Sequence, residues 1–355
     1  GDGVPPGTLS ISGPNPYLID IASGASLTAT TSGDGINILA GTSTGTVINN
    51  SGIVGSTFGD GIDFEGDGGV VNNLAGGMIT GGNGATDHGI EAGDDLTVVN
   101  DGIINTAVGG DDGINAGNDA IITNNVGASI SGDTDDGVDI DLRGIVNNNG
   151  TISGGDDGVF IGSGDVVNRS VVNNNTNFDP MFPFGPISGG SITGGDTGIL
   201  GGDFLTVNNR NLATITGNGD DGINANDFAI INNFSGGTIT GALSGIQVDD
   251  DLILVNEFGA TIEGLATNGV WAPGGDRADI TNDGLIRGGN YGILVDDDLI
   301  LDNGFFGTIT GTNEDGVQAD DRADITNNGI ITGLDDGIFV DDDATIVNND
   351  DGVIT

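Results

Sequence analysis

The fold is decided by a stretch that reads Asp335-Asp336-Gly337-Ile338-Phe339-Val340-Asp341-Asp342-Asp343-Ala344-Thr345-Ile346-Val347-Asn348-Asn349. It holds a short apolar run after an Asp-Asp-Gly corner, then a second acidic corner, then another apolar run that ends in two asparagines. The same unit recurs along nearly the whole chain, and a strand of the Gly-x-Ile-Thr-Gly type commonly follows it. Each copy therefore reads as three short strands separated by turns of Gly, Asn and Asp.

The glycine of the Asp-Gly-Ile motif marks each copy. Most intervals between these glycines are 21 to 28 residues, and one interval of 40 residues holds an insertion. A period in the range of about 20–50 residues indicates a solenoid or another repeat array. The thirteen marker glycines are Gly35, Gly61, Gly89, Gly113, Gly137, Gly158, Gly198, Gly222, Gly245, Gly269, Gly292, Gly316 and Gly337.

Apolar residues alternate within each copy, as in Ile114-Asn115-Ala116, instead of recurring every three or four residues as in a helix. Frequent glycine would also cost a helix about 1 kcal/mol per residue. A propeller blade needs about 40–45 residues, nearly twice this period. The sequence therefore predicts an all-β fold, a right-handed parallel β-helix of about thirteen three-strand coils of ~24 residues, with the Ile and Val of each marker strand inside.

A column of asparagines follows the marker strands. Asparagines 10 to 15 residues after most of the markers are expected to stack as a structural ladder, because a side-chain amide can bond to the coils above and below it. The expected ladder residues are Asn49, Asn72, Asn100, Asn124, Asn147, Asn208, Asn232, Asn256, Asn282, Asn303, Asn327 and Asn348.

The expected organisation has an N-terminal strand and cap-like coil in residues 1–32 and the β-helix in residues 33–355. Within the first part, Thr8–Ser12 resembles the strand that closes each coil. A loop insertion at 175–186 carries Phe178, Phe182 and Phe184, and it either folds back on the β-helix wall or offers a lateral contact or carbohydrate platform.

Composition excludes several function classes. The chain carries 53 acidic residues against six Arg, for a net charge of -47, so it lacks the positive field that binding to nucleic acid or anionic lipid requires. No apolar run approaches the length of about 20 residues that spans a bilayer, and we expect no membrane insertion by this region. The absence of Cys means that no disulfide holds the fold.

Acidic corners flank the marker strands on both sides, and stacked carboxylates repel each other. Arg143, Arg277 and Arg322 can neutralise part of this charge, and calcium is the expected partner of the rest, since hard cations take oxygen ligands. Simple solvated acidity is the alternative. The candidate metal ligands are Asp111, Asp112, Asp135, Asp136, Asp249, Asp250, Asp251, Asp296, Asp297, Asp298, Asp320, Asp321, Asp341, Asp342 and Asp343.

Catalysis is not expected. His88, in Asp87-His88-Gly89, occupies the position that Asp112 and Asp136 take in later coils, so it reads as a substituted repeat residue. A polygalacturonase-like site would also want an Arg-x-Lys element, and the chain has no Lys. Paired carboxylates are too abundant here to indicate general acid–base chemistry. We therefore assign no catalytic residue.

The two ends of the chain read as strands. Leu9 and Ile11 lie in the first, and Val353, Ile354 and Thr355 lie in the last. Uncovered strand edges pair with other chains. This predicts head-to-tail self-assembly through these five residues, or a native chain that continues beyond Thr355.

The Asp-Asp-Gly-Ile, Asn-Asn-x-Gly and Thr-Ile-Thr-Gly columns resemble the passenger regions of bacterial autotransporters and related large adhesins over residues 33–355. The resemblance implies export after signal-peptide removal, an extracellular or cell-surface location on a bacterium, and contact with carbohydrate or a cell surface. We expect a secreted structural or adhesive solenoid, assembled into a calcium-stabilised filament or biofilm matrix. The alternatives are a monomeric autotransporter passenger adhesin and, third, a polysaccharide-degrading enzyme.

Overall fold

The computed structural model describes residues 8–13, 16–41, 44–164, 170–175, 189–274 and 277–355. These residues form forty β-strands and no α-helix, so they include no helix long and apolar enough to cross a membrane. They divide into two compact units, unit 1 up to Gly162 together with Gly190–Gly195, and unit 2 for the remainder. Phe178, Phe182 and Phe184 lie outside the described residues.

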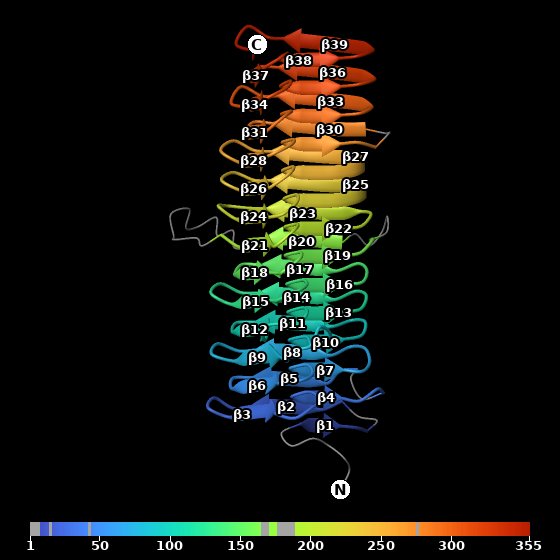
Figure 1. Ribbon diagram of the computed structural model, residues 1–355, viewed down its shortest axis with the longest axis vertical. Helices are drawn as coiled ribbons and strands as arrows, with labels where there is room; N and C mark the ends of the chain where they lie inside the picture. Colours follow the sequence, from blue (N-terminus) through green and yellow to red (C-terminus); the bar gives the residue numbers. More distant parts are fainter. Residues whose placement is uncertain (1–7, 14–15, 42–43, 165–169, 176–188, 275–276) are drawn as a thin grey trace. The chain divides into compact units, whose positions relative to one another are not determined.

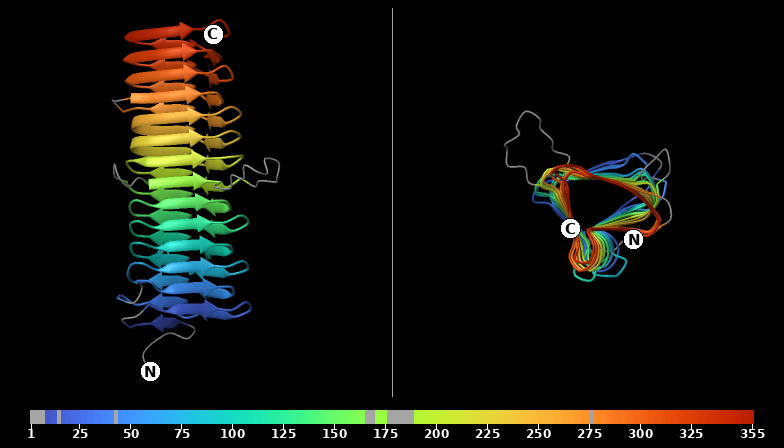
Figure 2. Two further views of the ribbon diagram at one scale, coloured as in Figure 1. Left: turned by 180° about the vertical axis from the view of Figure 1, so that it is seen from behind. Right: turned by 90° about the horizontal axis from the view of Figure 1, so that it is seen from above.

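Each coil contributes three strands, one to each side of a triangle, as the view from above shows (Figure 2). We name them the marker strand, which follows the marker glycine, the asparagine strand, and the closing strand. Within each unit the marker and asparagine strands belong to one sheet and the closing strands to a second. This confirms the predicted parallel β-solenoid, with about thirteen turns divided between the two units (Figure 1).

In unit 1 all three columns are built from strands of three or four residues. The marker strands are β1 (Leu9–Ile11), β4 (Ile36–Ile38), β7 (Ile62–Phe64), β10 (Ile90–Ala92), β13 (Ile114–Ala116), β16 (Val138–Ile140) and β19 (Val159–Ile161). The asparagine strands are β2 (Leu18–Ile21), β5 (Val47–Asn50), β8 (Val70–Asn73), β11 (Thr97–Asn100), β14 (Ile121–Asn124) and β17 (Ile145–Asn148). The closing strands are β3 (Ser26–Ala29), β6 (Ile53–Ser56), β9 (Met78–Gly81), β12 (Ile103–Thr106), β15 (Ser129–Ser131), β18 (Thr151–Ser153) and β21 (Ser191–Gly194).

Unit 2 follows the same plan, except that β25 (Ile223–Asn233) and β27 (Ile246–Asn256) run through the marker and asparagine positions without a break. Its other marker strands are β22 (Ile199–Gly201), β29 (Val270–Ala272), β32 (Ile293–Val295), β35 (Val317–Ala319) and β38 (Ile338–Val340). Its other asparagine strands are β20 (Ser170–Asn174), β23 (Leu205–Asn209), β30 (Arg277–Asn282), β33 (Asp298–Asn303), β36 (Arg322–Asn327) and β39 (Asp343–Asn348). Its closing strands are β24 (Thr214–Gly217), β26 (Thr238–Gly241), β28 (Thr261–Gly264), β31 (Leu285–Gly288), β34 (Thr308–Gly311), β37 (Ile330–Thr332) and β40 (Val353–Ile354).

The register stacks each apolar residue on its counterpart in the next coil. Ile90 lies opposite Ile62 on one side and Ile114 on the other, and all three are fully buried. One coil fills its interior from three sides with the buried side chains of Ile90, Val98 and Ile104. The predicted inward Ile and Val column is therefore confirmed, and it forms the core.

The first strand corrects one expectation. Thr8–Ser12 was expected to match the closing strands, but Leu9–Ile11 pairs with the marker strand β4, with Leu9 opposite Ile36. Short strands in both columns share an apolar–polar–apolar pattern, so the pattern alone does not separate them. The first closing strand is instead β3, which pairs with β6.

The marker glycine has a steric cause. A Cβ built on Gly113 would lie 2.6 Å from the carbonyl oxygen of Gly137 and 2.8 Å from a methyl group of Ile130. The Gly113 N–H donates to the carbonyl of Asp136 in the next coil at 3.0 Å. Close backbone approach at this corner therefore leaves no room for a side chain.

A buried asparagine ladder runs through each unit. In unit 1 the Asn100 side-chain amide donates to Asn124 Oδ1 at 2.9 Å, and Asn124 donates in turn to Asn148 Oδ1 at 2.9 Å and to the Thr151 carbonyl at 3.0 Å. In unit 2 the same chain of bonds links Asn174, Asn209, Asn233, Asn256, Asn282, Asn303, Asn327 and Asn348. Each side-chain amide nitrogen donates to the side-chain oxygen of the asparagine in the next coil, which keeps these buried polar groups paired.

The expected ladder was wrong by one residue in several coils. Where two asparagines end the strand, the second faces inward, because side chains alternate along a strand. The first lies half-buried on the outer face, where Asn72 donates to Asn49 Oδ1 at 2.8 Å. In five coils the expected ladder residue lies on the outer face, namely Asn49, Asn72, Asn147, Asn208 and Asn232. The residue that belongs to the buried ladder in these coils is the next one, namely Asn50, Asn73, Asn148, Asn209 and Asn233.

Replacing Asn124 with Ala should lower the free energy of unfolding by about 2–3 kcal/mol, because the Asn100 amide and the Thr151 carbonyl would each lose a buried partner. Asn125→Ala is the matched control, since its amide bonds to Asp101 on the exposed surface, and it should cost no more than about 0.5 kcal/mol. Urea unfolding followed by circular dichroism measures both. Equal losses in the two variants would contradict the ladder's role.

Candidate functional site

The chemistry-bearing side chains of unit 1 gather beside its marker strands. The residue before each marker glycine forms one row, which we call the corner row, and each corner residue from the second coil onward is nearly fully buried. Its members are Asp34, Asp60, His88, Asp112, Asp136 and Asp157. The corner row therefore places six ionisable side chains in register.

Each corner side chain accepts a hydrogen bond from the backbone of the next corner residue. The His88 N–H donates to Asp60 Oδ1 at 2.6 Å, and the Asp136 N–H donates to Asp112 Oδ1 at 2.7 Å. The Asp112 N–H donates to Nδ1 of His88 at 3.3 Å. His88 thus fills the same structural role as the aspartates, which agrees with its interpretation as a substituted repeat residue.

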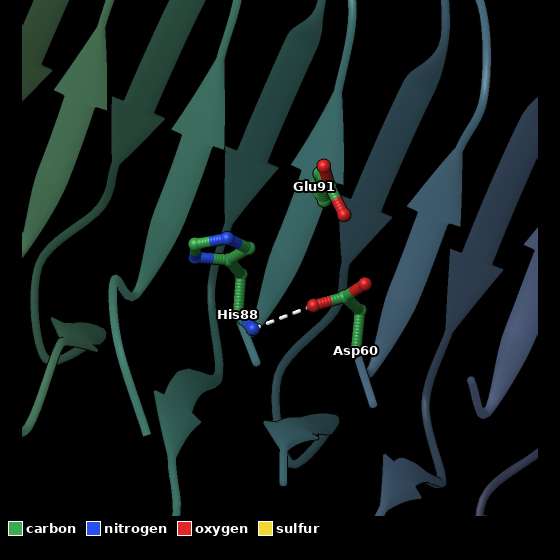
Figure 3. Close-up of side chains that lie close together, drawn as sticks. All are labelled: Asp60, His88 and Glu91. Atoms are coloured by element: carbon green, nitrogen blue, oxygen red, sulfur yellow. Dashed lines mark hydrogen bonds between the residues drawn. The ribbon is translucent and has the colours of Figure 1, made fainter. Parts of the chain in front are cut away.

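A second row of polar residues comes from the middle of the same strands. Its acidic members are Asp63 on β7, Glu91 on β10 and Asp139 on β16. Figure 3 shows Glu91 near Asp60 and His88, with the bond from the His88 N–H to Asp60. In four groups of three side chains, ligand atoms lie within 4.8 Å of one another. These groups are Asp34, Asp60 and Asp63; Asp60, His88 and Glu91; His88, Asp111 and Asp112; and Asp112, Asp135 and Asp136.

Burial and the repulsion from neighbouring charges raise the pKa of four carboxyl groups in these two rows. Burial raises the pKa of Asp63 to about 7, and the negative charges of Asp34 and Glu91 add to the effect. Burial also raises the pKa of Asp60 far above its ordinary value, against the bond from the His88 N–H. Farther along the row, burial raises the pKa of Asp136 to about 9 and that of Asp139 to about 7. The corner row and the three acids beside it, Asp63, Glu91 and Asp139, form what we call the acidic face of unit 1. This acidic face therefore favours bound protons or another positive charge near neutral pH.

His88 can change its bonding with its charge. Burial opposes the charged imidazolium, but the contact with Asp112 and the negative charges of Asp60 and Glu91 outweigh burial and raise the pKa of His88. Its Nδ1 lies 3.3 Å from Asp112 Oδ2 and 3.3 Å from the Asp112 backbone nitrogen. A neutral ring accepts the N–H, whereas a protonated ring donates to the carboxylate. The contact between His88 and Asp112 thus has one hydrogen-bond arrangement when the ring is neutral and another when it is protonated.

Two buried oxygens on this face have no hydrogen-bond partner among the described residues, namely Asn37 Oδ1 and Asp139 Oδ1. The Asn37 amide nitrogen meanwhile donates to Asp34 Oδ2 and Asp63 Oδ2, each at 3.0 Å. Asn37 therefore bridges two carboxylates while its own side-chain oxygen is unsatisfied. Unsatisfied buried oxygens are costly, and a cation is one partner that relieves them.

The predicted metal ligands separate into two sets. Asp111, Asp112, Asp135 and Asp136 lie in the close groups of unit 1. The remaining predicted aspartates lie half-buried or exposed at corners of unit 2, and none joins a group of three within the described residues. These are Asp249, Asp250, Asp251, Asp296, Asp297, Asp298, Asp320, Asp321, Asp341, Asp342 and Asp343.

Arginines offset some of the corner charge, as expected. Arg143 donates through two nitrogens to the Asp119 carboxylate of the preceding coil, at 2.9 and 2.8 Å, and this contact lowers the pKa of Asp119. Arg322 pairs with Asp298 in the same way between coils of unit 2. Arg277 pairs with Asp279 of its own strand and Arg287 pairs with Glu263 of the preceding coil, at 2.9 and 3.1 Å.

Sequence reasoning missed Asp34, Asp60, Asp63, Glu91 and Asp139. Asp34 and Asp60 occupy the corner position of shorter Asp-Gly motifs, which lack the doubled Asp that drew attention elsewhere. The other three lie between the two inward residues of a marker strand, where alternation places them on the outer face. A search for acidic residues at both positions in neighbouring coils would have found the site.

Comparison of the chain with protein-family models, curated proteins and solved structures gave no match. The function is therefore inferred from the geometry of the acidic face.

In the absence of divalent cations, stability should fall as the pH rises from 5 to 9. The folded pKa values of Asp63, Asp136 and Asp139 lie above 3.8, so the native state holds more protons than the unfolded state across this range, and the free energy of unfolding decreases. His88 acts in the same direction, because its raised pKa gives stability that is full below about 6.5 and lost at higher pH.

Urea unfolding in chelator at pH 5, 7 and 9 measures this dependence. Asp136→Asn keeps an oxygen for the Asp157 N–H but cannot ionise, so its stability should decline less steeply with pH than that of the unmodified chain. A flat or rising stability between pH 5 and 9 would show that the buried carboxyl groups do not bind protons as described.

Proposed function

We propose that this chain is an extracellular structural or adhesive β-solenoid, whose acidic face on unit 1 binds calcium. The observation that carries the proposal is the group of Asp34, Asp60 and Asp63, whose ligand atoms lie within 4.8 Å of one another, and Asn37 donates hydrogen bonds to two of these carboxylates. The cell-surface location and the likeness to autotransporter passengers enter the proposal from the repeat pattern alone.

The hydrogen bonds of the polar side chains support a structural function for the chain. Asparagine amides bond to asparagine amides, and corner side chains bond to the backbone of the next coil, so these repeated polar groups hold coils together. His88 has the same use, since its ring accepts the Asp112 N–H. A wall of this kind can present a long repetitive surface, as solenoid proteins do.

The ligand chemistry favours calcium at the first group. Asp34, Asp60, Asp63 and Asn37 offer only oxygen atoms, and calcium takes six to eight oxygen ligands in flexible geometry. The groups that include His88 offer a nitrogen as well, which suits transition metals better than calcium. A cation at the first group would replace the protons that its raised pKa values indicate.

Calcium should stabilise the chain strongly at pH 8.5 and weakly at pH 5, because protons compete for the same oxygens. At a calcium concentration about 100 times Kd the gain in the free energy of unfolding should reach about 2.7 kcal/mol. Thermal unfolding with added calcium, magnesium or chelator measures the gain. Equal stabilisation at both pH values would contradict binding at these carboxylates.

The variant Asp63→Asn distinguishes binding of calcium at this group from general screening of the chain's negative charge by calcium. This variant removes one ligand charge, so it should lose most of the calcium effect while becoming more stable than the unmodified chain in chelator at pH 8.5. Asp95→Asn is the matched control, since Asp95 is exposed at another corner of unit 1 and belongs to no close group. A calcium response retained in Asp63→Asn would exclude this group as the site.

End-to-end assembly stays a prediction. Leu9 and Ile11 lie in β1, which pairs with β4, and Val353 and Ile354 lie in β40, which pairs with β37. Negative-stain electron microscopy in calcium and then in chelator tests the prediction. Fibres that shorten on chelation are expected, whereas single particles in both conditions would leave a monomeric adhesin as the better account.

A further inference from the structure

Unit 2 carries exposed aromatic side chains in the turns between its asparagine and closing strands. Phe258, Phe305 and Phe306 are each about 60% exposed, with values of 60, 61 and 60%. The ring centroids of Phe258 and Phe306 lie 4.8 Å apart in an edge arrangement, and those of Phe305 and Phe306 lie 5.0 Å apart. Three phenylalanines thus form one apolar cluster on an otherwise acidic surface.

A short turn creates a notch at this cluster. The turns of Phe258 and Phe306 each have four residues, 257–260 and 304–307, between the asparagine strand and the closing strand. The turn between them has only Asp283 and Gly284. The two missing residues leave a groove of about 330 Å³, lined by Phe258 and Phe306 and by Asp283 and Leu285 below them.

The charges of the groove suit a cation. Asp283 is the only charged residue that lines it, and no salt bridge to Asp283 occurs within the described residues. Aromatic ring faces carry a negative quadrupole and attract ammonium or guanidinium groups within about 6 Å. Two aromatic rings and a carboxylate without a salt bridge among the described residues therefore line one small space.

In the same row of turns, an arginine of the chain itself already contacts an aromatic ring. The guanidinium carbon of Arg210 lies 4.5 Å from the ring centroid of Phe234, on the turns of two preceding coils of unit 2. Glu257 lines the same depression, so a carboxylate accompanies the ring there as well. The chain thus fills one aromatic–acidic position with its own arginine, whereas the notch at Asp283 has no such partner among the described residues.

We propose that the notch at Phe258, Asp283 and Phe306 binds a cationic side chain, guanidinium or ammonium, presented by a basic segment of a partner protein. A neutral sugar could stack on the rings and bond to Asp283, Thr261 and Thr308, but it would leave the negative charge of Asp283 unpaired. A cation engages the rings and Asp283 together, and the net charge of -47 draws basic segments to the surface. This site goes beyond the proposed calcium-binding scaffold and does not depend on it.

The test uses the full chain and the capped tripeptide Gly-Arg-Gly at 150 mM salt in chelator, followed by NMR of the peptide. The arginine side-chain protons should shift upfield, as protons do over an aromatic face. Phe306→Ala should weaken binding about three- to fivefold, in line with the strength of exposed cation–π contacts. The same peptide with citrulline, which has the shape of arginine without its charge, should not bind measurably, and neither should cellobiose.

Matched variants separate the notch from general attraction to an acidic protein. Phe58→Ala removes an exposed phenylalanine of unit 1, and Asp324→Asn removes an exposed carboxylate outside the groove. Both should bind the peptide like the unmodified chain, whereas Asp283→Asn should bind it more weakly. Unchanged binding by Phe306→Ala would overturn the proposal, as would binding of cellobiose without binding of the arginine peptide. Thermal unfolding of each variant confirms that it folds.

Discussion

In a parallel coil each side chain lies beside the side chain at the same position of the next repeat, and this constraint governs the whole structure. For isoleucine and valine, stacking like on like is favourable, because it removes apolar surface from water and fills the core. Ile62, Ile90 and Ile114 show this arrangement in successive coils. For polar residues the outcome depends on whether a group can bond to its own copy.

Asparagine satisfies the constraint and aspartate does not. An amide has a donor on one side and an acceptor on the other, so Asn100, Asn124 and Asn148 bond in a continuous series. A carboxylate has only acceptors. The corner row solves half of this problem, because one oxygen of Asp112 accepts the backbone N–H of Asp136. The remaining charge repels its neighbours, and protons, arginine or a metal ion must offset it.

The two units differ in how much of that charge is buried, since the corner positions of unit 1 include four buried aspartates and those of unit 2 include two, Asp221 and Asp315. On the acidic face of unit 1 burial raises the pKa of Asp63, Asp136 and Asp139, which favours their protonated forms. At the exposed corners of unit 2 the charge is left to solvent and to pairs such as Arg322 with Asp298. Binding of a cation should therefore change the stability of the chain more at the acidic face of unit 1 than at the exposed corners of unit 2.

The strand pattern, the period and the inward apolar column could be read from the sequence, because alternation and turn residues repeat thirteen times. The correct asparagine was also within reach, since alternation places Asn50 rather than Asn49 on the inner face. The acidic face was harder to find. Asp63, Glu91 and Asp139 each lie three residues after a corner residue, but only the stacking register brings them beside polar residues of neighbouring coils, as Glu91 lies opposite Asp63.

The central claim is that the acidic face of unit 1 exchanges protons for a cation. Potentiometry in weakly buffered solution at pH 7 counts the protons released when calcium is added. The account predicts release of roughly one to two protons for each ion bound, because at this pH Asp60 is mostly protonated and Asp63 is about half protonated. It also predicts that release disappears in Asp63→Asn. Calcium binding without proton release, or equal release in the variant, would contradict the account.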